Sequence, residues 1–295
     1  YPKPIVAERY APGAGGNVAQ NLTALGVARA TAFSVLGDDW RGSLLQRALD
    51  ACGVETETLV VDAARRTTAY IKPLLTGYES QQEDARLDFE NVEPLTARLE
   101  EALIRRVSDA LPELDAVIVA DQFEHNGVVT DRVREALIDL ARQHPRVVFV
   151  ADSRTRIGLF EQMVLKPNWR EAATAGGVDP EHDDENRQRE VARHLSRRAG
   201  HPVALTLSQS GVLLATEGTV TRVPAAPATP PLDPVGAGDT FVATLATALA
   251  AGATPPEGAA MANLAAAVIV EKLNQTGTAT PEEIRARYRI AATVA

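Results

Sequence analysis

AVIVAD at residues 116–121 and VVFVAD at residues 147–152 are the two stretches that decide the fold class. Each is a short, nearly continuous apolar run that ends in an aspartate, a pattern typical of strands buried on both faces of a parallel sheet. Because ligands bind outside the carboxyl ends of such strands, we expect Asp121 and Asp152 at the functional edge of the sheet. The alternatives are exposed strand ends or helix N-caps.

Residues on either side of these runs continue the alternation of strands and helices. The pattern predicts an α/β fold: a mostly parallel central sheet flanked by helices, forming one domain over residues 1–295. The predicted strands cover 30–36, 116–120, 147–151 and 163–165, and the predicted helices cover 40–51, 128–141, 239–252, 257–273 and 281–292. A helix is expected to begin within 179–189, and residues 224–234 form a Pro-rich loop.

One segment interrupts this order. Residues 67–75 and 85–89 alternate between apolar and polar side chains, and they flank a polar turn at 77–83. Such a pair predicts an antiparallel hairpin, which we interpret as a small β-lid over residues 67–89.

Composition excludes several classes of protein. The net charge is −9, with no block of five or more like charges, so we expect no nucleic-acid partner. The longest apolar runs are shorter than the roughly 18 residues of a membrane span, so we expect no membrane insertion. Cys52 is the only cysteine, which fits a reducing cytoplasm, and the five histidines lack zinc-ligand spacing.

The densest chemical motif is DPVGAGDT at residues 233–240, directly before an apolar helix. The backbone amides of Gly236, Ala237 and Gly238 at a helix start would form an anion site, most plausibly for a phosphate. Asp239 is well placed to act there as a base that receives a hydroxyl proton. Spacing alone leaves open the alternative that Asp239 or Thr240 caps the helix.

A second motif is GAGGN at residues 13–17. Gly15 and Gly16 would allow close approach of a ligand, and Asn17 can both donate to and accept from hydroxyl groups. The match to a dinucleotide-binding fingerprint is poor because Val18 stands where a glycine is needed. No Walker-type nucleotide motif occurs in the sequence.

The third motif is KPNWRE at residues 166–171. Asn168 and Glu171 lie three residues apart on one face of a helical turn, where they could hold a hydrated Mg²⁺ and nucleotide phosphates. A capping turn would produce the same pattern, and this motif alone favours that interpretation.

In this order the three motifs resemble those of the ribokinase-like (PfkB) carbohydrate kinase family over nearly the whole chain. The resemblance implies that Asp239 is the general base and that the amides of Gly236, Ala237 and Gly238 are the anion hole. It also implies that Asn168 and Glu171 organise Mg²⁺·ATP.

The same resemblance extends to further residues. Gly15, Gly16 and Asn17 would bind the sugar, and Asp233 and Val235, with the loop 274–278, resemble the segments that hold a monovalent cation such as K⁺ in some members. The implied ATP-binding residues are Lys166, Asn168, Glu171, Thr206, Ser208, Gly211 and Asn263.

Two features concern the branch of the family. RLDFE at residues 86–90 and KLNQTGTATP at 272–281 look closest to the heptose-7-phosphate kinase branch, whereas DQFEHNG at 121–127 replaces its typical D-Y-x-K-G. Family members also have a first strand ending in Gly-Asp well before the glycine motif, which here starts at Gly13. We therefore expect that strand to be absent from this chain.

The function implied is ATP-dependent phosphorylation of a sugar or sugar phosphate, with ATP and Mg²⁺ as cofactors. Related kinases often pair their lids, so we expect a homodimer. The alternatives are a nucleoside kinase of the same fold, a catalytically silent sugar-binding relative, and a dehydrogenase.

Overall fold

A six-stranded sheet forms the centre of the computed structural model, which describes residues 3–77, 80–181, 183–273 and 275–294. The strand order is β12-β11-β10-β9-β8-β7, in which β7 to β10 run parallel and β11 and β12 pair antiparallel. The prediction of a mostly parallel sheet is confirmed. The strands are β7 (Ala116–Asp121), β8 (Val148–Ser153), β9 (Val164–Leu165), β10 (Val203–Thr206), β11 (Val212–Thr216) and β12 (Thr219–Val223).

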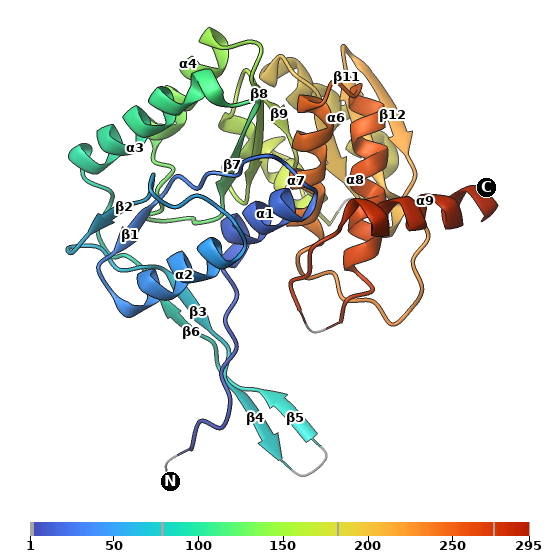
Figure 1. Ribbon diagram of the computed structural model, residues 1–295. Helices are drawn as coiled ribbons and strands as arrows, with labels where there is room; N and C mark the ends of the chain where they lie inside the picture. Colours follow the sequence, from blue (N-terminus) through green and yellow to red (C-terminus); the bar gives the residue numbers. More distant parts are fainter. Residues whose placement is uncertain (1–2, 78–79, 182, 274, 295) are drawn as a thin grey trace.

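Helices cover both faces of this sheet (Figure 1). On β8, Phe149 packs into the core with Leu103 and Leu195, whereas Val150 packs into a second cluster with Phe241. Because neighbouring side chains of β8 enter different clusters, both of its faces are buried. This explains why the sequences of β8 and of the adjacent β7 are continuous apolar runs. The first face carries α3 (Ala97–Ala110), α4 (Asp131–Gln143), α5 (Trp169–Ala175) and α6 (Glu185–Ala199), and the second carries α1 (Gly13–Ala24), α7 (Ala237–Ala250) and α8 (Pro255–Ile269), with α9 (Pro281–Val294) packed on α8.

A smaller layer precedes the sheet in the chain. Strands β1 (Val35–Gly37) and β2 (Val60–Asp62) form a parallel pair beside α2 (Trp40–Ala51), a helix with the predicted bounds. The strand predicted at 30–36 is mostly wrong, because residues 30–34 make only scattered backbone hydrogen bonds to the segment 55–60 and an isolated bridge at Thr31.

The lid contains two short ladders in place of one hairpin. β3 (Ala69–Ile71) pairs with β6 (Leu87–Phe89), and β4 (Leu74–Gly77) pairs with β5 (Ser80–Glu83). Pro73 separates the ladders because proline has no N–H to donate, while its carbonyl accepts the amide of Asp84 at 2.9 Å. The prediction that residues 80–83 belong to a turn is wrong. Figure 1 shows the lid projecting from the body, with the N-terminal segment alongside it.

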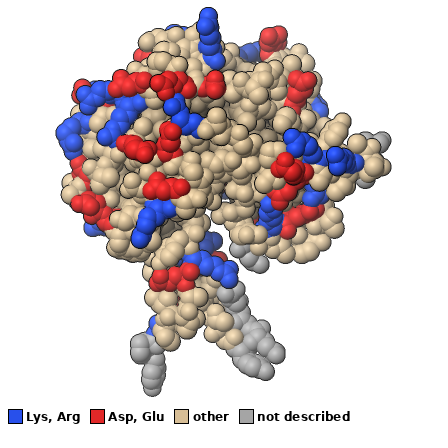
Figure 2. Space-filling view, viewed as in Figure 1, with Lys and Arg blue, Asp and Glu red and all other residues tan. Residues whose placement is uncertain are grey.

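The remaining segments follow the predictions more closely. Residues 224–234 contain no helix or strand, and α6 begins at Glu185, inside the expected range. Short 3₁₀ helices occur at η1 (Leu111–Glu113), η2 (Ile157–Leu159) and η3 (Ser208–Ser210). Within the described ranges, no helix combines the length and apolar character needed to cross a bilayer. Basic and acidic side chains are interspersed over the face drawn in Figure 2.

A cavity of about 2050 Å³ lies between β1 and β7. Its walls include core side chains such as Val35, Val119 and Leu103. Of the strands in the described ranges, β7 is hydrogen-bonded only to β8 and β1 only to β2, so each presents an open edge. One part of the cavity reaches the glycine-rich start of α1.

Candidate active site

Asp239 lies in the first turn of α7 and does not cap that helix. The N-cap is Gly236, whose φ of +81° is a left-handed conformation that suits glycine, and it makes no side-chain capping bond. The Asp239 carboxylate faces α1 instead, where Asn17 Nδ2 donates to Asp239 Oδ2 at 3.1 Å. The capping alternative is therefore wrong. No side chain in the described ranges accepts from the amides of Gly236 and Gly238, whereas the Ala237 amide donates to the Pro234 carbonyl at 3.2 Å.

Burial raises the pKa of Asp239 from 3.8 to about 6. The hydrogen bond from Asn17 and the charge of Lys166 act in the opposite direction, while the charge of Asp152 raises the pKa further. A carboxylate with this pKa is deprotonated near neutral pH but basic enough to accept a proton from an attacking hydroxyl group.

Asn17 has a second notable atom. Its Oδ1 is buried and has no hydrogen-bond partner within the described part of the chain, although the residue is only 7% exposed. A buried polar atom without a partner is unfavourable, so this oxygen is suited to accept a hydrogen bond from a ligand hydroxyl.

Asn21 fixes this helix in place. Its Oδ1 accepts the Thr240 hydroxyl at 3.0 Å and the Ala279 amide at 3.3 Å. Asn21 and Thr240 are both almost fully buried, so α1 and α7 are held in register beside Asp239. We did not identify Asn21 from the sequence, although its spacing of four residues from Asn17 places both on one helix face.

Lys166 lies against the same helix start. Its Nζ forms a buried ion pair with Asp152 Oδ1 at 3.2 Å, and a Cβ added to Gly238 would lie 3.6 Å from that nitrogen. Burial lowers the pKa of Lys166, but the charges of Asp152 and Glu171 outweigh burial and raise it overall. A permanent positive charge therefore faces the amides of α7.

Asn168 and Glu171 form the capping box of α5. Asn168 Oδ1 accepts the Glu171 amide at 2.9 Å, and Glu171 Oε2 accepts the Asn168 amide at 2.8 Å. The capping interpretation is confirmed. Glu171 Oε1 makes no hydrogen bond to any described residue, and burial raises the pKa of this carboxyl, with Lys166 opposing the shift.

Thr206, Ser208 and Gly211, which the resemblance assigns to ATP binding, belong to a segment that lies next to the turn of Asn168 and Glu171. A bridge between Asn168 and Thr206 joins the end of β10 to the start of α5. Gly211 has a φ of +79°, and a Cβ there would lie 2.3 Å from the Val223 carbonyl oxygen, so no other residue fits. Ser208 also has a positive φ, of 50°.

Asn263 lies on α8 near the same loop. Its Nδ2 donates to the carbonyls of Val223 and Pro224, the latter at 2.8 Å. The amide nitrogen of Asn263 thus holds the loop 224–234.

The predicted monovalent-cation segments meet at the start of α7. Asp233 Oδ1 accepts the Val235 amide at 3.0 Å, and a Cβ on Gly236 would lie 3.6 Å from Thr276 Cα. Asn274, in the expected loop, is outside the described residues. No group of three His, Cys, Asp or Glu side chains suited to a metal occurs in the ranges that the structure covers.

Asp121 and Asp152 both lie at the expected sheet edge, and both are buried. Asp121 accepts from Ser153 Oγ at 2.6 Å and from Arg156 Nε at 3.1 Å. The alternatives of exposed strand ends and of helix N-caps are therefore wrong for these residues, because both are buried and the N-caps of α4 and α5 are Thr130 and Asn168.

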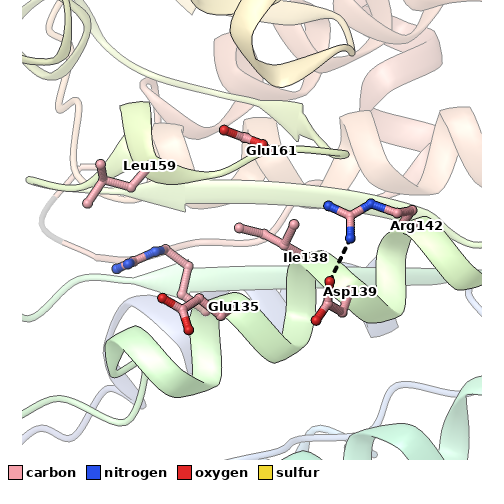
Figure 3. Close-up of a pocket in the computed structure, with 7 residues that line it drawn as sticks. Glu135, Ile138, Asp139, Arg142, Leu159 and Glu161 are labelled. Atoms are coloured by element: carbon pink, nitrogen blue, oxygen red, sulfur yellow. Dashed lines mark hydrogen bonds and ion pairs between the residues drawn. The ribbon is translucent and has the colours of Figure 1, made fainter.

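A second cavity, of about 400 Å³, lies over α4 and shares no residue with this site (Figure 3). Both acidic and basic side chains line this cavity, and Arg142 Nη1 forms an ion pair with Asp139 Oδ1 at 2.7 Å. It is lined by Arg134, Glu135, Ile138, Asp139, Arg142, Leu159 and Glu161.

The sequence model for pfkB family carbohydrate kinases matches residues 6–283, which covers all three motifs. The chain belongs to this family. It is therefore a kinase, and the resemblance inferred from the motifs is confirmed.

Relatives named "Bifunctional protein HldE" match most of this carbohydrate kinase. The protein from Desulfatibacillum aliphaticivorans is 32% identical over 279 residues, covering 94% of this chain and 55% of the relative. The one from Caulobacter sp. is 35% identical over 289 residues, covering 96% of this chain and 57% of the relative. The chain thus spans little more than half the length of these relatives.

Solved structures support the fold. Phosphofructokinase-2 from Escherichia coli in complex with potassium aligns with a TM-score of 0.71 at 18% identity, over 94% of this chain and 86% of the other. Arabidopsis thaliana ribokinase complexed with ribose and ATP aligns with a TM-score of 0.70 at 20% identity, over 93% and 86%. The ribokinase-like fold is confirmed.

Proposed function

We propose that this kinase transfers the γ-phosphoryl group of ATP to a hydroxyl of a sugar or sugar phosphate, with Asp239 as the general base. The observation that carries the proposal is the pair of Asn17 and Asp239. It joins the glycine-rich start of α1 to the start of α7 and leaves Asn17 Oδ1 buried, with no hydrogen-bond partner among the described residues. Asn17, with Gly15 and Gly16 beside it, would orient a sugar hydroxyl toward the base.

The start of α7 would stabilise the charge that develops during transfer. The amides of Gly236 and Gly238 have no side-chain acceptor among the described residues, the Ala237 amide donates to the Pro234 carbonyl at 3.2 Å and would have to exchange it for the phosphate, and Lys166 lies beside them. Preorganised donors of this kind reduce the barrier because they need no rearrangement as charge builds up.

ATP would bind at the adjacent edge, between the turn of Lys166, Asn168 and Glu171 and the loop of Ser208 and Gly211. Thr206 lies at the start of this loop. Asn263 donates a hydrogen bond to the Pro224 carbonyl and so positions the neighbouring segment on the other side of the loop. Glu171 Oε1 is the carboxylate oxygen that fits a hydrated Mg²⁺, which supplies charge neutralisation of the phosphates when bound. Asp233 and Val235 are the residues that we assign to a K⁺ site.

The lid would close over the acceptor and exclude water from the site. Its outer ladder exposes Leu74 and Leu75, and Leu87 and Ile71 are exposed nearer the body. An apolar lid surface of this kind suits pairing with a second copy, so we propose a lid-mediated homodimer, working in the cytoplasm.

The names of the HldE relatives and the 272–281 motif make heptose 7-phosphate the first acceptor to assay. The machinery would also serve a nucleoside kinase, and Tyr70 and Phe123, whose ring centroids lie 6.3 Å apart, line the same cavity as Asn17, so nucleosides belong in the same assay. The intact Asp239 and glycine motif argue against a catalytically silent relative.

The test is an assay of ADP formation with a panel of sugars and sugar phosphates, for the wild-type protein and for Asp239→Asn. Asn keeps the size of the side chain and the acceptor for Asn17 but cannot take a proton. We expect kcat to fall at least ~10²-fold, with little change in the KM for ATP. Asp109→Asn, an exposed change on α3, is the matched control. Near-normal turnover by Asp239→Asn would remove Asp239 from the role of base.

A further inference from the structure

The segment 224–234 joins β12 to α7 without secondary structure of its own (Figure 1). Five of its eleven residues are proline, which has no N–H, so the segment offers few donors for strand pairing. None of its residues is buried, so hydrophobic packing holds it only weakly. Its position therefore depends on the few hydrogen bonds that it makes.

The two ends of this segment lie at two parts of the proposed ATP site. At one end, a Cβ on Gly211 would lie 2.5 Å from the Ala225 amide nitrogen, so the segment begins against the loop of Ser208 and Gly211. At the other end, the Asp233 amide donates to the Val270 carbonyl at 2.7 Å, just before α7 begins. The middle of the segment thus runs between the nucleotide loop and the amides of α7.

An ion pair between Glu271, just after α8, and Arg287, on α9, holds this middle part. Arg287 Nη1 donates to Glu271 Oε1 at 2.9 Å, and Nη2 donates to Oε2, so the pair is bidentate. Arg287 Nη1 also donates to the Pro227 carbonyl at 2.9 Å, and Glu271 Oε1 accepts the Thr229 amide at 2.7 Å. Among the described residues, the stretch 225–232 makes no other hydrogen bond.

The helix α9 does not depend on this pair for its own position. Ile284 packs with Ile269 and Ala279 in a hydrophobic cluster between α8 and α9. Lys272 Nζ also pairs with Glu283 Oε1 at 2.6 Å. Removal of the Glu271–Arg287 pair should therefore release the segment and leave the helix in place.

We propose that Glu271 and Arg287 are positioning residues, which hold residues 227–229 in the conformation that binds ATP. The inference rests on the proposed function, which places ATP beside this segment. A segment that is not held must be ordered each time ATP binds, and this cost lowers the affinity. Because the Val270 carbonyl anchors the start of α7 separately, the pair should affect ATP binding more than the chemical step.

The test is a kinetic comparison of the wild type with Arg287→Met, which keeps a long apolar side chain but removes the guanidinium. We expect the KM for ATP to rise about 5- to 50-fold, while kcat and the KM for the acceptor change less than about threefold. Arg287→Lys keeps the charge and should recover part of the affinity. Glu271→Ala should resemble Arg287→Met, and the double variant should be no worse than the worse single variant, because the two residues act together.

Arg285→Met is the matched control. Arg285 is exposed on the same helix and pairs with Glu282 at 3.1 Å, three residues earlier, so the variant removes the same charge and an ion pair remote from the segment 224–234. It should behave as wild type. If Arg285→Met raises the KM for ATP as much as Arg287→Met does, the effect is one of net charge and the proposal is overturned.

Calorimetric titration with a non-hydrolysable ATP analogue and Mg²⁺ measures nucleotide binding without an acceptor. If no acceptor is phosphorylated but Arg287→Met weakens this binding and Arg285→Met does not, the proposed function fails and the assignment of the pair stands. If Arg287→Met binds the analogue as the wild type does, the pair serves at most the stability of the fold and the inference fails. A wild-type chain that binds no analogue would overturn both.

Discussion

Asp239 illustrates how a residue suited to catalysis can reduce the stability of the fold. Its carboxylate is buried beside α1, and its pKa in the folded protein, about 6, is above the 3.8 expected in the unfolded chain. The folded protein therefore binds more protons than the unfolded chain between about pH 4 and 6. Consequently, the free energy of unfolding decreases as the pH rises through this window.

We predict that Asp239→Asn is more stable than the wild type at pH 7.5, by about 1–3 kcal/mol, since the amide carries no buried charge. The difference should shrink as the pH falls toward 4, where the wild-type carboxyl is protonated. Urea unfolding at both pH values measures it, with Asp109→Asn as an exposed control. A variant less stable than wild type at pH 7.5 would contradict this account of Asp239.

Glu171 offers a second test at a single residue, because its two oxygens have different environments. Oε2 completes the capping box of α5, whereas Oε1 is the oxygen assigned to the metal. Gln also completes a capping box, so Glu171→Gln should leave the thermal unfolding temperature within a few degrees of the wild type.

The same variant should raise the Mg²⁺ concentration needed for half-maximal rate, without a change in the KM for the acceptor. Glu190→Gln, exposed on α6, serves as the control. A Mg²⁺ titration that superimposes on the wild-type curve would exclude Glu171 from the metal site.

At the scale of the element, the lid separates into an inner and an outer ladder that can be tested apart. Pro73 and Asp84 already approach closely through a backbone hydrogen bond, so residues 74–83 can be replaced by a two-residue turn. We expect the core to stay folded, because the outer ladder lies outside the hydrophobic clusters. The acceptor KM and the ratio of ATP hydrolysis to acceptor phosphorylation should both rise, because water is no longer excluded.

The double variant Leu74→Ser and Leu75→Ser keeps the outer ladder but removes its apolar surface. It should weaken dimerisation, measured by sedimentation, more than it changes the ratio of hydrolysis to transfer. If the deletion alters neither kinetics nor sedimentation, the hairpin has no role as a lid or as a dimer contact.

Elements with a strong local pattern could be predicted from the sequence. The helix α2 has the predicted bounds, β7 ends one residue later than predicted, and β8 begins one residue later and ends two residues later. The lid ladder β4–β5 could not be predicted, because β4 is exposed along its whole length, so burial of an apolar face does not fix how it pairs.

At the scale of the whole molecule, the motifs indicated the residues of the site but not how they interact. Local sequence pattern could not show that Asn17 donates to Asp239 or that Lys166 pairs with Asp152. It also could not show that Asn168 Oδ1 and Glu171 Oε2 are both occupied by the hydrogen bonds of a helix cap. Each is a contact that depends on the three-dimensional arrangement of the chain, and only the last left a signal in the spacing.

The long separation between Asn17 and Asp239 also bears on how the protein is made. Because 222 positions separate them, a ribosome adding about 5–20 residues per second needs roughly 10 to 45 seconds between synthesising one and the other. During this interval the apolar face of α1, including Val18, lacks Phe241 and Val242, its partners from α7. The hydrogen bond from the Ala279 amide to Asn21 Oδ1 can form only later, after residue 279 has been synthesised. The nascent chain is thus exposed to chaperones before it is an enzyme, and ribosome stalling upstream of α7 would leave an N-terminal fragment that is inactive and prone to aggregate.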